Sequence, residues 1–222
     1  GTATRLNGRL SIHAYSVGKE KRPHGFRRIA VVSIYVPQGN AHQAPNPTPT
    51  PETLNPGDEP VPETKVVIDP RETFLSEVAD IVNQLRSSGH IIILAGDFNL
   101  APSAFDRSTR ATYKRGERNE HQIFQNFLEQ SNLCDTFREI HPTLEAYSYH
   151  SVHNTKSRID LILCDPKIRH LIAGARISNH KPMNTASEYD HRLVEVDFHL
   201  DALLSQTNLP TAPLPPKEPK KF

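Results

Sequence analysis

The chain has 222 residues, of which 36% are hydrophobic, and a formal net charge of +1. This length and apolar content predict a single domain with one sizeable core, and the near-neutral charge excludes a protein that binds nucleic acid through bulk positive charge alone. The two cysteines are too few for a disulfide framework and suit a reducing, intracellular compartment, and no apolar run is long enough to span a bilayer, so we expect no membrane partner.

The amino-terminal part of the sequence predicts a buried strand followed by an insertion. Residues 27–36 are almost continuously apolar and rich in β-branched residues, which is typical of a central strand covered on both faces. From residue 37 to residue 62 the chain is dense in Pro, Asn, Thr and Gly, a composition that cannot bury apolar surface. We therefore predict an inserted loop there.

A helix and a strand that ends in a polar motif come next. Asp69 is a typical N-cap with Pro70 at the first helical position and Glu72 in the place of a capping-box partner, and Gly89 ends the pattern. The apolar run 90–95 then predicts a strand that leads into Gly-Asp-Phe-Asn at residues 96–99. In an extended segment Asp97 and Asn99 share one side, with Phe98 turned into the core.

The residue types of this motif suit phosphate chemistry. A carboxylate such as that of Asp97 is a ligand that Mg²⁺ prefers and can orient a water, and the amide of Asn99 can donate to a phosphate oxygen. The alternative is an ordinary turn after a strand, because Gly, Asp and Asn favour turns for local reasons.

The segment after the motif is basic and leads into a second helix. Its cations suit a phosphate backbone as well as they suit a solvated loop. They are Arg107, Arg110, Lys114, Arg115 and Arg118. A helix is predicted near residues 119–130 from its apolar side.

Strands are predicted near residues 146–151, 158–164, 171–177 and 192–200, and polar residues stand beside two of them. In the first of the two, the apolar side chains share one face and leave Arg158 and Asp160 on the other. The second is entered directly from Asp190-His191. Residues 205–222 are rich in Pro and Lys and predict a flexible tail, which leaves 1–204 as the domain.

In this order the motifs resemble those of the endonuclease/exonuclease/phosphatase superfamily, and most closely the endonuclease domains of non-LTR retrotransposons. The matching segments are Ile34-Tyr35-Val36-Pro37, Gly96-Asp97-Phe98-Asn99, Ser157-Arg158-Ile159-Asp160 and Asp190-His191, with 135–142 and 147–151 resembling the retrotransposon branch. The resemblance implies an α/β fold, a four-layer sandwich of two packed β-sheets flanked by helices. It also implies Mg²⁺-dependent hydrolysis of DNA phosphodiester bonds, with Mn²⁺ as a substitute, and a nuclear location.

The resemblance also implies a role for each site residue. Asp97 would orient or deprotonate the water, and Asn99 and Tyr35 would contact the phosphate. Asp160 would hold the ring of His191, which would bind or protonate a phosphate oxygen. A carboxylate beside an imidazole also raises the imidazole pKa on physical grounds. Asp190 and Asp97 are the metal-ligand candidates. The substrate-binding candidates are Arg158, which would otherwise brace Asp160, together with Ser148, Lys114 and Arg115.

Two departures from the family pattern keep other functions open. The family's asparagine-bearing strand and the strand ending in a metal-binding glutamate do not precede Leu10, so we expect an amino-terminally incomplete domain with impaired activity. Tyr189 stands where the family usually has serine. The alternatives are a phosphatase or phosphodiesterase for small phosphate esters and a degenerate module of the same fold that binds nucleic acid without cutting it. The sequence gives no indication of oligomeric state.

Overall fold

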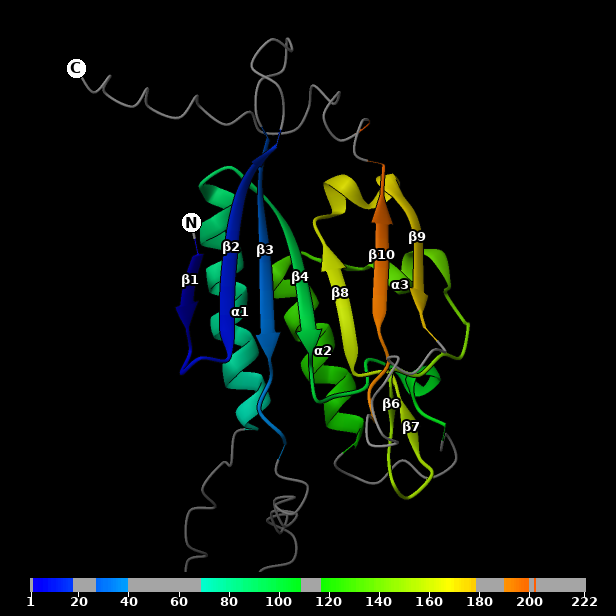
Figure 1. Ribbon diagram of the computed structural model, residues 1–222. Helices are drawn as coiled ribbons and strands as arrows, with labels where there is room; N and C mark the ends of the chain where they lie inside the picture. Colours follow the sequence, from blue (N-terminus) through cyan, green and yellow to red (C-terminus); the bar gives the residue numbers. More distant parts are fainter. Residues whose placement is uncertain are drawn as a thin grey trace, which may run out of the picture.

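The computed structural model describes residues 2–17, 27–39, 69–108, 117–178, 190–199 and 202, with the backbone alone for residues 2–5, 117 and 118. Within them, six strands form the main sheet (Figure 1). In spatial order they are β1 (Thr2–Arg5), β2 (Leu10–Val17), β3 (Arg27–Tyr35), β4 (His90–Asp97), β8 (Asp160–Cys164) and β5 (Cys134–Asp135).

The directions of the central strands decide where the polar motifs meet. β3 and β4 are parallel, whereas β8 is antiparallel to β4. The carboxyl ends of β3 and β4 therefore lie at the same edge of the sheet as the beginning of β8, the lower edge in Figure 1. This edge gathers residues that are far apart in the sequence.

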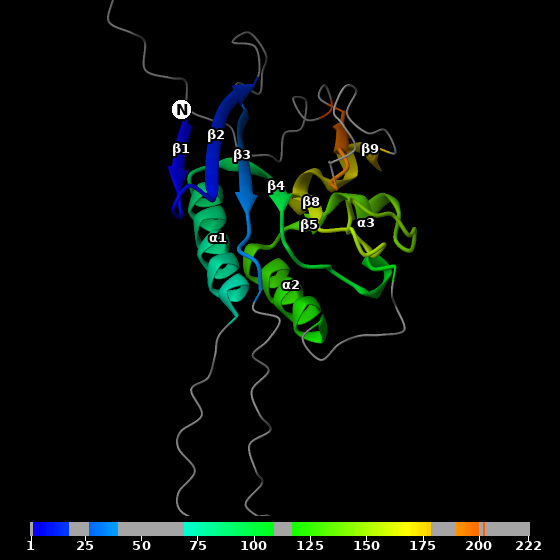
Figure 2. The ribbon, with the colours of Figure 1, turned by 60° about the horizontal axis from the view of Figure 1, so that its bottom comes forward.

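Two long helices, α1 (Pro70–Ser87) and α2 (Glu117–Ser131), cover one face of the main sheet (Figure 2). The predicted start of α1 is confirmed, because the Asp69 side chain accepts a hydrogen bond from the backbone N–H of Arg71 and Pro70 occupies the first turn. Gly89 follows the helix with a φ of 83°, a left-handed conformation that favours glycine. The helix that we predicted at 119–130 is α2.

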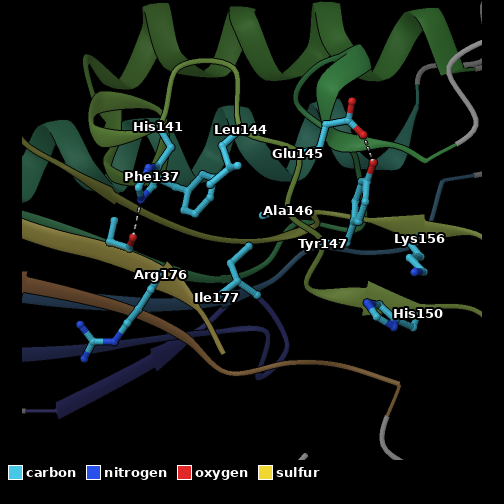
Figure 3. A pocket seen from close by; sticks show the side chains of 11 residues that line it. Phe137, His141, Leu144, Glu145, Ala146, Tyr147, His150, Lys156, Arg176 and Ile177 are labelled. Carbon is cyan, nitrogen blue, oxygen red and sulfur yellow. Dashed lines mark hydrogen bonds between the residues drawn. The ribbon is translucent and has the colours of Figure 1, made fainter. Parts of the chain in front are cut away.

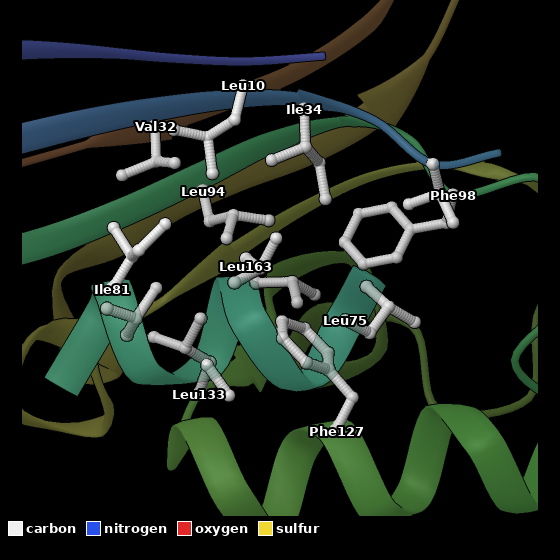
Figure 4. Close-up of a cluster of buried hydrophobic side chains, with 14 of the residues drawn as sticks. Leu10, Val32, Ile34, Leu75, Ile81, Leu94, Phe98, Phe127, Leu133 and Leu163 are labelled. Atoms are coloured by element: carbon white, nitrogen blue, oxygen red, sulfur yellow. The ribbon is translucent and has the colours of Figure 1, made fainter. Parts of the chain in front are cut away.

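The main core lies between these helices and the sheet. Alternate side chains of β3, β4 and β8 point into it, and Figure 4 shows Leu94 of the sheet facing Leu75 of α1 and Phe127 of α2. Phe98 is fully buried in the same cluster, as we predicted from its place in the Gly-Asp-Phe-Asn motif. The remaining side chains of these strands point to the opposite face of the sheet.

A smaller sheet packs over part of that opposite face. It consists of β9 (Ile172–Ile177) and β10 (Val194–Phe198), which pair antiparallel. A second buried cluster joins Ile29 and Ile91 of the main sheet to Ile172, with Val196 and Phe198 packed against it. The short helix α3 (Thr136–Ile140) lies against β9.

The remaining elements are short. The strands β6 (Tyr149–His150) and β7 (Lys156–Ser157) form a hairpin near the polar edge of the main sheet (Figure 1). Two 3-10 helices, η2 (Ala104–Asp106) and η3 (Pro166–Leu171), follow β4 and β8 respectively. Every strand predicted after residue 130 is present, although β6 is shorter than its predicted range.

The predicted α/β class, with two packed sheets, is thus confirmed. The main sheet carries helices on one face and the smaller sheet on the other. Most of the predicted insertion at 37–62 and all of the tail at 205–222 lie outside the described residues, so the domain boundaries stay a prediction. None of the helices in the described part of the chain has the length and apolar character that crossing a membrane requires.

Candidate active site

Three polar residues lie side by side on adjacent strands at the edge where β3 and β4 end. Tyr35 is the register partner of Asp97, and Asp97 is the register partner of Asp160. Side chains of directly paired residues point to the same face of a sheet. Because Ile34 and Leu161 point into the helix-covered core, these three point to the opposite face. Sheet pairing alone therefore brings Tyr35, Asp97 and Asp160 together.

Gly96 permits this arrangement. A Cβ atom at this position would lie 1.9 Å from the carbonyl oxygen of Ile34 on the neighbouring strand. The φ of Gly96 is 156°. Only glycine therefore allows β3 and β4 to approach so closely immediately before Asp97.

Asn99 lies at the site, and hydrogen bonds of its backbone and side chain hold it there. The strand ends at Asp97, and Asn99 adopts a left-handed φ of 48°. Its backbone N–H donates to Asp97 Oδ1 at 2.8 Å, and its side-chain amide donates to the carbonyl of Val36 at 2.7 Å. A local turn thus brings Asp97 and Asn99 together, where we expected the alternation of an extended segment. The amide retains one N–H that the Val36 contact does not use.

His191 reaches the site through the β6–β7 hairpin. Tyr149 of β6 forms an isolated antiparallel bridge with His191, and the N–H of His150 donates to the carbonyl of Asp190 at 2.8 Å. The rings of Tyr149 and His191 lie 5.0 Å apart between centroids. The hairpin therefore fixes both the backbone and the ring of His191.

The imidazole of His191 is bound by a carboxylate. Its Nδ1 lies 2.8 Å from Oδ2 of Asp160. An ionised carboxylate only accepts hydrogen bonds, so Nδ1 carries the proton and Nε2 is left for substrate. The hydrogen bond to Asp160 raises the pKa of His191 above its ordinary value, against a smaller effect of burial, and the charges of Asp97 and Asp190 add to the rise.

Asp97 lies in a partly buried, negatively charged setting. Burial raises the pKa of Asp97, and the charges of Asp160 and Asp190 raise it further, whereas the N–H of Asn99 and the charge of His191 lower it. Ligand atoms of Asp97, Asp160 and His191 all lie within 4.8 Å of one another. The structure thus brings together three of the predicted catalytic residues, with Tyr35 beside Asp97 in the sheet.

Ser148 positions the site from beneath, and the prediction that it contacts substrate is wrong. Its side chain is fully buried, and its hydroxyl oxygen accepts hydrogen bonds from the N–H groups of Ile159 at 3.1 Å and Asp160 at 3.0 Å. Its carbonyl accepts a hydrogen bond from the N–H of Arg192. One serine therefore joins the segment of Asp160 to the segment of His191.

Arg158 is also misassigned as a substrate-binding residue. Its side chain is 1% exposed and forms ion pairs with Asp106 at 2.5 Å and Asp135 at 2.7 Å. Its guanidinium stacks 5.3 Å from the ring centre of Phe137. The hydrogen bonds that the structure gives its guanidinium go to Asp106 and Asp135 and not to Asp160.

The prediction also missed a buried ion network behind Asn99. Arg71 pairs with Asp69 and with Glu120 and donates to the carbonyl of Asn99 at 3.1 Å. Glu120 in turn accepts from the N–H of Ala101 at 3.1 Å. The network ties both helices to the loop that follows the motif. An Arg next to a helix N-cap gives no sequence signal for this role.

The basic segment is only partly described. Arg107 pairs with Glu120 at 2.5 Å and so belongs to the ion network. Lys114 and Arg115, two substrate-binding candidates, lie outside the described residues together with Arg110, and the side chain of Arg118 does as well. Their contact with substrate stays a prediction.

A pocket of about 370 Å³ lies beside the β6–β7 hairpin (Figure 3). Its lining is partly aromatic and partly cationic, and includes Tyr147, Phe137, Lys156 and Arg176. The charges of Arg192 and Lys156 reach His150 on the hairpin, whose pKa is lowered by burial and by these two cations. Two cations, Arg192 and Lys156, thus lie close to His150 of the hairpin.

Comparison with solved structures finds proteins of similar fold. The 3′-5′ exonuclease NExo from Neisseria meningitidis matches with a TM-score of 0.57 and 20% identity over 84% of this chain and 70% of that chain. The 3′ phosphatase NExo from Neisseria bound to a product DNA hairpin matches with a TM-score of 0.54, 20% identity and the same coverage. An AP endonuclease from Archaeoglobus fulgidus matches with a TM-score of 0.56 and 16% identity over 89% of this chain and 70% of that chain.

These neighbours, at 16–20% identity, show a shared fold. A family model described as endonuclease-reverse transcriptase matches residues 29–195, which contain Tyr35, Asp97, Asp160 and His191. The chain belongs to the endonuclease-reverse transcriptase family.

Proposed function

We propose that this chain is a retrotransposon-type endonuclease domain that hydrolyses DNA phosphodiester bonds with the aid of a divalent cation. The observation that carries the proposal is the alignment of Tyr35, Asp97 and Asp160 on adjacent strands with His191 hydrogen-bonded to Asp160. Family membership and the fold support nucleic-acid hydrolysis.

Each residue has a role that its surroundings suit. The raised pKa of Asp97 makes its carboxylate a better proton acceptor for a water that attacks phosphorus. The raised pKa of His191 favours an imidazolium near neutral pH, and that cation donates from Nε2 to a non-bridging phosphate oxygen. Asp160 keeps the ring oriented and charged. Tyr35, which is 47% exposed, offers its hydroxyl to the same phosphate, as does the remaining N–H of the Asn99 amide.

The donors at the site fit a hard cation such as Mg²⁺. Hard cations take carboxylate oxygens, and the charges of Asp160 and Asp190 already raise the pKa of Asp97, a crowding that a dication would relieve. Asp97 and Asp190 would hold the ion, since Asp160 is engaged with His191. When bound, the ion would neutralise charge that develops on the phosphate oxygens.

We further propose that this site binds Mg²⁺ weakly and needs high Mg²⁺ or Mn²⁺ for nicking. Among the described residues, the possible metal-binding group consists of Asp97, Asp160 and His191; it contains no glutamate and does not include Asp190. Tight binding depends on how many charged ligands a site supplies. Half-maximal nicking at the low Mg²⁺ concentration that satisfies an AP endonuclease assayed in parallel would contradict this proposal.

DNA is the favoured substrate over a small phosphate ester. Arg192 and Lys156 lie close to His150 of the β6–β7 hairpin, and two such cations suit a polyanion. Val152, at the tip of the β6–β7 hairpin, is 93% exposed, so the hairpin projects beyond what one small ester needs.

Supercoiled plasmid and small phosphate esters such as p-nitrophenyl phosphate separate the alternatives. We expect metal-dependent conversion of plasmid to the nicked form and negligible release from the ester. Faster ester hydrolysis would identify a small-ester phosphatase. Plasmid binding in a gel-shift assay without nicking at any Mg²⁺ or Mn²⁺ concentration would identify the degenerate module.

A further inference from the structure

The two cysteines of the chain lie directly opposite each other in the main sheet. Cys134 of β5 is the register partner of Cys164 of β8, and the two strands are antiparallel. Directly opposed residues of an antiparallel pair have Cα atoms about 4.5–5.5 Å apart, which lies within the range of about 4.4–6.8 Å that disulfides span. The sheet therefore supplies the backbone geometry of a cross-strand disulfide.

The thiols themselves are free and in contact. The Sγ atoms lie 3.6 Å apart, and the Cys134 thiol also lies 3.3 Å from the carbonyl of Cys164. A disulfide requires a separation of about 2.05 Å. Rotation of the cysteine side chains can shorten the Sγ–Sγ distance from 3.6 Å to the disulfide length without movement of the backbone.

The two thiols differ in access. Cys164 is fully buried in the second core, whereas Cys134 is partly exposed at its border. The hydrogen bond between them lowers the pKa of Cys134 and, together with burial, raises the pKa of Cys164. An accessible thiol with a buried partner behind it is the arrangement of an attacking and a resolving cysteine.

We propose that Cys134 and Cys164 form a redox-active dithiol that a small-molecule disulfide of the glutathione type oxidises to an intramolecular disulfide. The Cys134 thiolate attacks one sulfur of the small disulfide, forms a mixed disulfide and expels one thiolate. Cys164 then loses its proton to that thiolate or to water and attacks the Cys134 sulfur, which expels the second small thiol. Two protein thiols are oxidised while one small disulfide is reduced to two thiols.

The bond would cross-link β5 to β8, the strand that starts at Asp160. Asp160 and Cys164 lie on the same face of β8, four residues apart, and Asp135 next to Cys134 pairs with Arg158. The cross-link constrains the unfolded chain over the loop from 134 to 164, so the melting temperature should rise on the order of 10 °C. Oxidation would thus stabilise the pairing of β5 with the strand that carries Asp160, at the end of β8 opposite to Asp160.

The test uses the full chain, which has only two cysteines, so every thiol is assigned. Reduced protein is incubated with oxidised glutathione, the remaining thiols are alkylated and the intact mass is measured. We expect both thiols to disappear together, with no glutathione retained. Two alkylated thiols, a persistent glutathione adduct or disulfide-linked dimers would each overturn the proposal.

Single-cysteine variants test the order of events. Cys164→Ser should accumulate a glutathione adduct on Cys134, whereas Cys134→Ser should remain unmodified because Cys164 is buried. Modification of Cys134→Ser at the rate seen for Cys164→Ser would overturn the assigned roles. The melting temperature of the wild-type chain, before and after oxidation and again after dithiothreitol, keeps the test valid if a variant fails to fold. An unchanged melting temperature would contradict the cross-link.

Discussion

The imidazole of His191 is hydrogen-bonded through Nδ1 to the carboxylate of Asp160 at 2.8 Å, although 31 positions separate the two residues in the sequence. The β6–β7 hairpin holds the histidine segment, and the pairing of β8 with β4 holds the aspartate. The contact is therefore a product of tertiary structure.

Replacing Asp160 with asparagine should lower the pKa of His191 toward its ordinary value of about 6.5, because the main cause of the rise is removed. The charge interaction between the two residues stabilises the fold fully below about pH 6.5 and is lost as the pH rises through the raised pKa of His191. The difference in unfolding free energy between wild type and Asp160→Asn should therefore shrink as the pH rises from about 6.5 through the raised pKa of His191.

Proton NMR titration of the His191 ring in metal-free protein measures this pKa, and denaturant unfolding at several pH values measures the stability difference. Asp197→Asn is the matched control, because Asp197 pairs with Arg176 on the exposed edge of the smaller sheet. An unchanged His191 pKa in Asp160→Asn would show that the hydrogen bond is not formed in solution.

Replacing Ser148 with alanine should leave the N–H groups of Ile159 and Asp160 without their acceptor. The loss should cost about 1–3 kcal/mol in the free energy of unfolding, as for other buried unsatisfied groups. Catalytic activity should fall as well, because the same hydroxyl positions Asp160. Urea unfolding and nicking assays measure the two effects.

Ser151→Ala is the control for this change. In the described part of the chain, the Ser151 hydroxyl accepts a hydrogen bond only from the exposed hairpin N–H of His153. It should leave stability within about 0.5 kcal/mol of wild type. If the two substitutions lowered stability and nicking equally, Ser148 would have no special role in positioning Asp160.

Replacing Arg158 with leucine should strongly destabilise the chain. It leaves Asp106 and Asp135 buried without their shared cation, and breaking one side of a buried ion pair costs about 3–5 kcal/mol. Burial alone would raise the pKa of Asp106, and it is Arg158, with Ser103 and Arg138, that keeps this pKa low. Arg176→Leu, in an exposed pair, should change the urea midpoint little. A folded Arg158→Leu with normal stability but weakened DNA binding would restore the substrate-binding assignment.

Replacing Gly96 with alanine should disturb the edge where β3 and β4 end. The added Cβ would meet the Ile34 carbonyl at 1.9 Å, and overpacking of this kind costs about 1–3 kcal/mol. The relative loss of nicking rate should exceed the relative loss of stability, because the displaced residue 96 is the neighbour of Asp97 in the chain. Gly174→Ala is the control, since its Cβ would meet Asp197 at an ordinary 3.8 Å. Wild-type activity in Gly96→Ala would contradict the close approach.

Much of the fold follows from local patterns in the sequence. The apolar run before Gly96 predicts a strand, and Asp69 and Pro70 predict a helix start. That Asp97, Asp160 and His191 meet is predicted by the resemblance of the ordered motifs to a known family, because no local spacing joins them.

The supporting contacts could not be predicted, because they join residues with no local pattern. Arg158 reaches Asp106 across 52 positions, and Asp106 lies in a short 3-10 helix without any distinguishing signal. In the sequence Ser148 is an ordinary strand serine, and only the structure shows that its hydroxyl accepts a hydrogen bond from the N–H of Asp160. Buried polar groups form hydrogen bonds with residues that the tertiary structure brings near, so their roles are visible only in the structure.

The most direct test of the central claim compares plasmid nicking by the wild-type chain with nicking by Asp97→Ala and His191→Ala at saturating Mg²⁺ or Mn²⁺. Asp80→Ala, on the exposed side of α1, serves as the control. Each site substitution should lower the nicking rate about 10²-fold or more, as expected for loss of a proton acceptor or a charged donor, while the control keeps wild-type activity. Nicking by either site variant at the wild-type rate would contradict the assignment of this cluster as the catalytic centre.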